Sequence, residues 1–137
     1  MRSGPNPSGP TLREEKNEMN VTGIDATYYV VTDIDGTTKF YTQLLGAEPA
    51  MRGGPVSEWT FSDGSSFGLY QSEQAEKGSN GSAMFAVPDI NAAVAKAKAD
   101  GIHFHGDGEV TDTPVCFMAF GEDSEGNQFI FHTRKSG

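Results

Sequence analysis

One pattern occurs twice along the chain, and this internal repeat limits the possible folds more than any other feature. The segment VVTDIDGTTKFYTQLLG at residues 30–46 and the segment AVPDINAAVAKAKADG at residues 86–101 both read as a strand end, a Val-x-Asp-Ile motif, a helix and a glycine. Later matches pair Gly64, Phe67, Leu69 and Tyr70 with Gly126, Phe129, Phe131 and His132. A repeat of this kind indicates one structural unit that is used twice.

The helix of each unit has recognisable ends. In the first unit Asp33 or Asp35 can cap the start of the helix, and in the second unit Asp89 or Asn91 can do so. Gly46 suits the left-handed position that commonly follows a helix. Apolar residues recur at helical spacing, which predicts one buried face for each helix.

Strands are expected on both sides of each helix. Residues 24–32 are rich in β-branched and aromatic types, as an opening strand would be. Further strands are expected near residues 48–52, 56–62 and 66–71 in the first unit, and near residues 102–105, 114–121 and 127–133 in the second. Each unit therefore has the order βαβββ, and the predicted class is α+β with antiparallel-rich sheets.

The chain length suits a single domain. Its 137 residues are an ordinary domain size. Residues 1–20 are rich in Gly, Pro, Ser and charge, so we interpret them as a flexible tail or a leftover of cloning. Residues 21–137 would form the domain, with module one at residues 22–72 and module two at residues 80–134.

Charge and cysteine content restrict the possible classes of partner and the cellular compartment. The formal net charge of −9 argues against nucleic acid and anionic membranes as partners, and it is compatible with a cationic ligand. No run of about 18 apolar residues is present, so no membrane span is expected. Cys116 is the single cysteine, which excludes an internal disulfide and suits a reducing cytosol. We therefore expect a cytoplasmic protein.

Four segments carry a resemblance to a known family: VTDIDGTTKFYTQLLGAE, WTFSDGSSFGLYQ, FAVPDINAAVAKAKADGI and DTPVCFMAFGEDSEGNQFIFH. Over nearly all of residues 22–134 the chain resembles the glyoxalase / bleomycin-resistance / extradiol-dioxygenase superfamily, also called vicinal oxygen chelate proteins. The resemblance implies two βαβββ modules whose curled sheets enclose a cleft. It also implies a homodimer.

Enzymes of that family usually bind a divalent metal through one side chain from each of four strands. By position, the resemblance assigns these ligands to Ala26, Gly68, Ile130 and Ser82, with Ala83 as the alternative to Ser82. A divalent metal needs imidazole, carboxylate or thiolate donors. We therefore predict no metal ligands and no cofactor, and we keep a divalent metal with relocated ligands as an alternative.

Strand alternation predicts which residues line the cleft, because side chains two positions apart share a face. If Ile130 faces the cleft, His132 does so too. Either Glu58 or its neighbour Trp59 faces it, and a Trp there could stack on a planar or cationic ligand. The predicted ligand-binding residues are Tyr28, Trp59, Tyr70, Met84, Met118 and His132.

Four further features have a structural interpretation beside a functional one. His132 is either a base or ligand contact, or a half-exposed histidine at a strand end. His103 and His105 could bind zinc with a nearby carboxylate, but two histidines without a fixed third donor are a weak signal. Cys116 fits a small buried hydrophobe. The turn EDSEG fits a hairpin turn better than a calcium loop.

Two functions remain open from the sequence. A metal-free binding protein would hold a small, partly aromatic or cationic molecule in the cleft or across a dimer interface. Alternatively, the chain is an enzyme of the same superfamily, either a metal-dependent lyase or dioxygenase with relocated ligands or a metal-free acid–base catalyst. His132, His105 and Glu58 are its candidate catalytic groups. The binding protein is the favoured interpretation, because the side chains at the expected metal-ligand positions cannot bind a metal.

Overall fold

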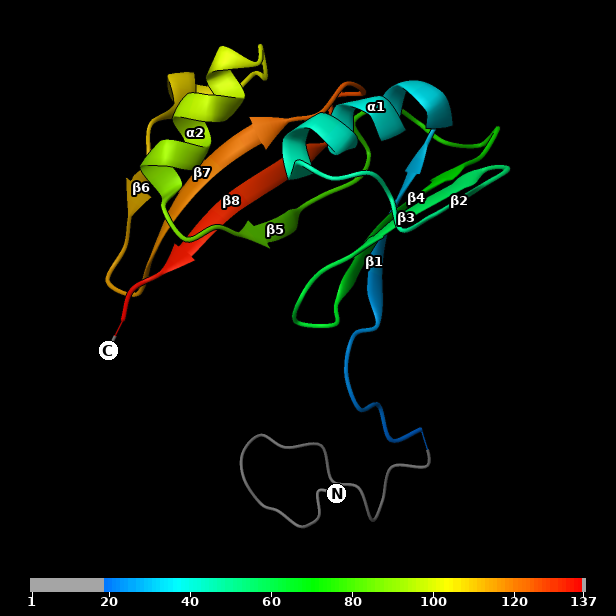
Figure 1. Cartoon of the computed structure of the whole chain (residues 1–137), viewed down its shortest axis with the longest axis horizontal. Helices are drawn as coiled ribbons and strands as arrows, with labels where there is room; N and C mark the ends of the chain where they lie inside the picture. Colours follow the sequence, from blue (N-terminus) through cyan, green and yellow to red (C-terminus); the bar gives the residue numbers. More distant parts are fainter. Residues whose placement is uncertain (1–18, 137) are drawn as a thin grey trace.

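The computed structural model describes residues 19–136, so most of the tail predicted at residues 1–20 lies outside the described residues. The first module contains β1 (Ala26–Val31), α1 (Ile34–Leu45), β2 (Met51–Gly53), β3 (Val56–Thr60) and β4 (Ser66–Gln71). Its strands form one sheet in the order β1-β4-β3-β2 (Figure 1). Strand β1 is parallel to β4, and the other neighbours are antiparallel.

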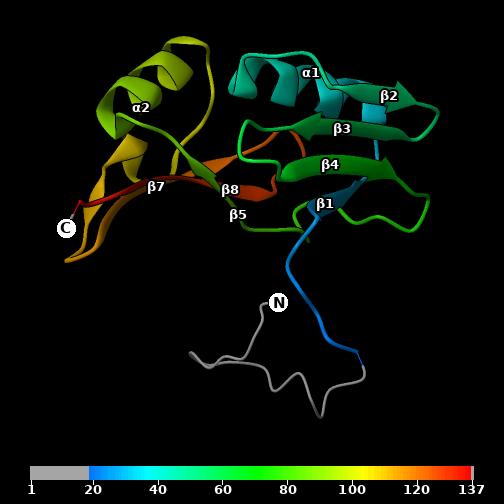
Figure 2. The ribbon, with the colours of Figure 1, turned by 60° about the horizontal axis from the view of Figure 1, so that its bottom comes forward.

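The second module repeats this arrangement. It contains β5 (Ala83–Ala86), α2 (Ile90–Ala99), the 3-10 helix η2 (His105–Gly108), β6 (Thr111–Asp112), β7 (Cys116–Glu122) and β8 (Gln128–Arg134). The sheet order is β5-β8-β7-β6, with β5 parallel to β8. Helices α1 and α2 lie on one side of the two sheets (Figure 2). The predicted α+β class and the repeated βαβββ order are confirmed.

The strand predicted at residues 102–105 is not formed. Phe104 makes only an isolated bridge with Gly121, and η2 follows at once. Within η2, Gly106 and Asp107 have φ angles of 61° and 57°. This left-handed conformation cannot continue a strand, so the chain turns away from the sheet. The outermost strand of the second sheet is instead the short β6, further along the chain.

The helix ends follow the capping chemistry of the sequence. Asp33 accepts a hydrogen bond from the backbone N–H of Gly36 at 3.1 Å, and Asp89 accepts one from Ala92 at 3.2 Å. These two residues are therefore the N-caps among the predicted alternatives. Gly46 takes the left-handed conformation with a φ of 74°. No helix in the described residues is long and apolar enough to cross a membrane.

One aromatic core joins the two modules beneath the helices. The ring of Tyr41 on α1 lies 4.9 Å from that of Phe67, and Phe67 lies 5.1 Å from Phe85 of the second module, measured between ring centroids. Burial of each such ring stabilises the fold by about 1.5–3 kcal/mol. The pleat separates the two faces of β1, so Tyr29 is buried whereas Tyr28 is 38% exposed.

A side chain covers the edge of β1 where the modules meet. The Asn80 amide accepts a hydrogen bond from the Val30 N–H at 3.0 Å and donates one to the Val30 carbonyl at 2.8 Å, as a neighbouring strand would. The backbone N–H of Asn80 donates to Asn127 Oδ1 at 3.0 Å. These bonds satisfy backbone groups that an uncovered edge would leave open to other chains.

The acidic turn at residues 123–127 joins β7 to β8, and its two carboxylate side chains are buried. Asp123 and Glu125 are each only 7% exposed. The Tyr41 hydroxyl donates to Asp123 at 2.8 Å, and the Thr32 hydroxyl donates to Glu125 at 2.9 Å. Both contacts cross from one module to the other, so the turn fixes how the modules pack.

Candidate ligand site on the outer sheet faces

We use the term outer face for the side of each sheet that points away from α1 and α2. In the first sheet, the strand register places Tyr28 and Glu58 on either side of Gly68. Tyr70 lies one step along β4 on the same face and pairs with Val30. Tyr28 and Tyr70 are 38% and 45% exposed. Two aromatic rings and one carboxylate therefore meet at this surface.

A hydrogen bond from the Tyr28 hydroxyl to the Glu58 carboxylate crosses the middle of this face. The tyrosine ring lies directly over Gly68, where a Cβ atom would come within 2.4 Å of Tyr28 Cζ. Glycine is therefore needed for this close approach. The hydrogen bond to Glu58 raises the pKa of Tyr28 to about 12, with smaller contributions from desolvation and from the Glu58 charge.

The outer face of the second sheet is more apolar. The register places Met84 opposite Ile130, and it places His132 between Ala86 and Met118. Met84 is 50% exposed, Ile130 is 7% exposed, and His132 is half-buried. The predicted lining residues Met84, Met118 and His132 thus share one face, and His132 pairs with Met118 across the two strands.

The positions that the family resemblance assigns to metal ligands carry no metal-binding side chain. They hold Ala26, Gly68, Ile130 and Ser82, whose side chains supply neither imidazole, carboxylate nor thiolate. Among residues 19–136, no three His, Cys, Asp or Glu side chains are grouped so that they could hold a metal ion. The Glu58 carboxylate already accepts the Tyr28 hydrogen bond.

Trp59 does not belong to the outer face, which corrects its predicted role in ligand binding. It is 2% exposed, and its indole N–H donates to the Ala47 carbonyl at 2.8 Å. Adjacent strand residues point to opposite faces, so Trp59 enters the core and Glu58 faces outward. The aromatic surface of this face comes from Tyr28 and Tyr70 instead.

The remaining candidate residues lie around η2 and β7. The rings of His103 and His105 are 5.9 Å apart and edge to face. They lie in a loop and at the start of η2, and His105 Nε2 lies 3.9 Å from Glu122 Oε2. Cys116 is 8% exposed, and its Sγ lies 3.2 Å from the Thr113 hydroxyl. This environment fits the interpretation of Cys116 as a small buried side chain.

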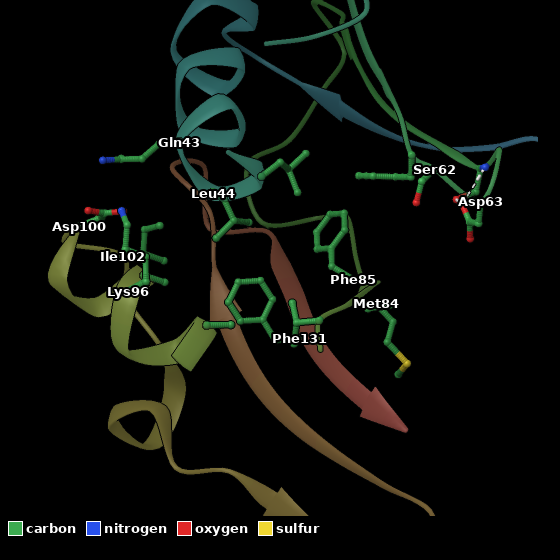
Figure 3. A pocket seen from close by; sticks show the side chains of 17 residues that line it. Gln43, Leu44, Ser62, Asp63, Met84, Phe85, Lys96, Asp100, Ile102 and Phe131 are labelled. Carbon is green, nitrogen blue, oxygen red and sulfur yellow. Dashed lines mark hydrogen bonds and ion pairs between the residues drawn. The ribbon is translucent and has the colours of Figure 1, made fainter. Parts of the chain in front are cut away.

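A separate cavity of about 590 Å³ lies on the helix side of the sheets, between the two modules (Figure 3). Its walls come from the end of α1, the turn between β3 and β4, strand β5 and helix α2. Of the six predicted ligand-binding residues, only Met84 lines it. Sequence reasoning missed this cavity because its walls come from both modules. The small side chains of Ala93 and Ala97 on α2 were the available signal.

Comparison with known proteins identifies a family and a fold. The sequence profile of the Glyoxalase/Bleomycin resistance protein/Dioxygenase superfamily matches residues 23–131. No functionally curated protein matches the chain.

Solved structures of other proteins align with most of the chain. A protein from Agrobacterium tumefaciens gives a TM-score of 0.71 at 20% identity, covering 85% of this chain and 100% of its own. A glyoxalase / bleomycin resistance protein from Catenulispora acidiphila gives 0.65 at 18% identity, with coverage of 81% and 98%. A protein named oxidase ChaP-H1 gives 0.67 at 18% identity, with coverage of 85% and 99%. Similarity at such identities shows a shared fold alone.

Proposed function

Because the chain belongs to the glyoxalase/bleomycin resistance protein/dioxygenase superfamily, we propose that it is a metal-free member that binds a small aromatic or cationic molecule. The site is the outer face of the first sheet, around Tyr28, Glu58 and Tyr70. The residues at the family's metal positions favour binding over metal chemistry, because they offer no suitable donors. One scaffold hosts both activities, so the side chains of the site carry the argument.

The single observation that carries this proposal is the hydrogen bond between Tyr28 and Glu58 above Gly68. It holds an aromatic ring and a carboxylate side by side on an exposed surface. A planar cation gains from both, because the ring face attracts positive charge and the carboxylate pairs with it. The net charge of −9 favours the approach of a cation from solution.

We propose further that a second copy of the chain closes the site. Tyr28, Val30, Tyr70 and Met84 are apolar side chains that remain 38–50% exposed on the outer faces. Burying such surface is the usual driving force for a homodimer. Analytical ultracentrifugation should show a dimer. A monomer at every concentration tested would contradict this part of the proposal.

The remaining properties follow from charge and from cysteine content. The acidity argues against nucleic acid or an anionic membrane as a partner. One buried free cysteine is compatible with a cytoplasmic location. We therefore propose a cytoplasmic protein whose partners include neither nucleic acid nor anionic membranes. Fractionation of the native host, with detection by antibody, tests the location.

The binding proposal is tested with a panel of aromatic cations, neutral aromatics and aromatic anions, measured by calorimetry. We expect saturable binding of cations, weakened by Glu58→Gln and by Tyr28→Leu. Glu73→Gln removes an exposed carboxylate elsewhere and should leave affinity unchanged. Equal effects of Glu58→Gln and Glu73→Gln would show that only net charge matters, against a site at Glu58.

The absence of a metal requirement is tested separately. Protein purified without an affinity tag or chelator is analysed for metal by mass spectrometry, and its melting temperature is followed on adding Zn²⁺, Ni²⁺, Mn²⁺ or Fe²⁺. We expect no stoichiometric metal and no shift in melting temperature. A stoichiometric metal that EDTA removes would place the protein with the metal enzymes of the family.

The same hydrogen bond favours a second candidate function, that of a metal-free acid–base enzyme. A tyrosine hydroxyl and a carboxylate in contact could deliver and accept a proton. His132, on the other sheet, and His105, on η2, remain the earlier candidates for this role. Turnover that is lost in Tyr28→Phe and Glu58→Gln, but kept in His132→Ala and His105→Ala, would support this function and assign it to the Tyr28–Glu58 pair.

A further inference from the structure

The cavity between the modules lies mainly on the helix side of the sheets, whereas the proposed ligand site occupies the outer face of the first sheet (Figure 3). Its volume of about 590 Å³ is in the range that holds a drug-sized molecule. We propose that this cavity is a second binding site, and that it takes an aromatic molecule carrying a protonated amine. This inference does not depend on the function proposed for the outer face.

The interior of the cavity is apolar and aromatic. Phe85 and Phe131, which are 9% and 5% exposed, form one wall, and Phe61 lies against Phe85 with 6.3 Å between ring centroids. Leu44 of α1 and Ile102 complete this surface. Aromatic walls of this kind bind a flat apolar ring through edge-to-face and offset contacts.

The cavity exists because the two halves of the repeat pack differently. In the second module Glu125 reaches α1 of the first module and accepts a hydrogen bond from Asp33 N at 2.8 Å. Its counterpart in the repeat, Asp63, accepts hydrogen bonds from the N–H and the hydroxyl of Ser65 within its own turn, at 3.0 and 2.6 Å. The turn that carries Asp63 lines the cavity instead of capping α2.

Small side chains keep the space open on the opposite wall. The α2 residues that face the cavity include Ala93 and Ala97. Ala97 is buried at 4% exposure, and Ala93 is half-buried at the rim. A larger side chain at Ala93 would therefore enter the cavity without replacing a core residue.

Charges at the rim favour a cation. Lys96 and Asp100 form an ion pair at 2.5 Å, so these two lining residues largely neutralise each other. Asp63 is left as the uncompensated charge among the lining residues, and hydrogen bonds from Ser65 keep its pKa below the ordinary value. The last turn of α1 carries no basic residue, so its carbonyl end adds negative potential at the same rim.

The test compares two probes of the same shape and opposite charge, naphthylmethylamine and naphthoate. Binding to the full chain at neutral pH is measured by calorimetry and by NMR. The amine should bind saturably, and naphthoate should bind at least about threefold more weakly, the scale of one charge contact open to water. Absence of saturable amine binding, or equal binding of both probes, would overturn the inference.

Variants then locate the probe. In a Glu58→Gln background, which removes the cation contact of the outer face, Ala93→Phe should weaken amine binding about tenfold or more, because the added ring occupies the volume that the probe needs. Ala95→Phe places the same ring on the exposed side of α2 and should leave the affinity for the amine unchanged. Asp63→Asn should weaken the amine about threefold, and Lys96→Gln should strengthen it.

Two outcomes would overturn the second binding site. Loss of binding in Glu58→Gln with no change in Ala93→Phe would place the amine on the outer face and overturn the second site. Affinity that falls as protein concentration rises would show that a second copy covers the cavity, which also overturns it. Failure at the outer face leaves the Ala93 and Asp63 results unaffected, so the two proposals are separable.

Discussion

The carboxylate of Glu125 accepts a hydrogen bond from the backbone N–H of Asp33 at 2.8 Å, which ties the second module to the first turn of α1 in the first module. The Thr32 N–H and the Thr37 hydroxyl also donate to this carboxylate, at 2.9 and 3.2 Å. A negative charge at the amino end of a helix is favoured by the helix dipole and by the open N–H groups there. One turn of the second module therefore acts as a cap for the helix of the first.

Glu125→Ala should destabilise the protein by about 2–4 kcal/mol, because several donors buried around the carboxylate would lose their acceptor. Asp63→Ala, at the matching position of the repeat, should cost about 1 kcal/mol or less, because that side chain is exposed. Urea denaturation followed by circular dichroism measures both. Equal losses would show that the turn at residues 123–127 does not hold the modules together.

The pKa of Tyr28 should fall from about 12 toward its ordinary value of 10.0 in Glu58→Gln, because the hydrogen bond to Glu58 is the largest cause of the shift. Tyrosinate absorbance, taken as the difference from Tyr28→Phe, measures it. A raised pKa in the folded state stabilises the protein below pH 10, and this contribution is lost as pH rises toward 12. Between pH 10 and pH 12, the free energy of unfolding should therefore fall less for Tyr28→Phe than for the wild type.

Gly68→Ala should displace the Tyr28 ring and break its hydrogen bond to Glu58, because the new Cβ would lie 2.4 Å from Tyr28 Cζ. The expected result is a lower Tyr28 pKa in a protein that still folds, since alanine is accepted in strands and the ring is partly exposed. Gly53→Ala on β2 is the control, because no atom lies within 4 Å of its added Cβ. An unchanged Tyr28 titration in Gly68→Ala would contradict the close packing of ring and glycine.

Asn80→Asp should weaken the edge of β1, because a carboxylate would face the carbonyl of Val30 and Oδ1 of Asn127, which both accept hydrogen bonds from the Asn80 amide. We expect a loss of about 1–3 kcal/mol. Hydrogen exchange of the Val30 amide, followed by NMR, should accelerate. Ser79→Ala changes an exposed neighbour and should leave this exchange rate as it was. Unaltered protection of Val30 in Asn80→Asp would show that the amide does not cover the edge.

Local patterns in the sequence predicted the order of elements well. Asp33, Asp89 and Gly46 cap or end the helices as their chemistry requires, and alternation along β1 separates buried Tyr29 from exposed Tyr28. These features depend on residues within a few positions of one another. The strand predicted at residues 102–105 is reduced to one isolated bridge between Phe104 and Gly121, because η2 already begins at His105.

The sequence by itself determined that one βαβββ unit is used twice, with an aspartate at the start of each helix. Only the tertiary structure decided that Glu58 faces outward while Trp59 enters the core, that Glu125 caps a distant helix, and that a cavity separates α2 from the first module. The physical reason is the separation along the chain between the residues that interact. Capping and strand alternation arise between near neighbours in the chain, whereas these contacts join residues from different elements, whose meeting depends on how two whole modules pack.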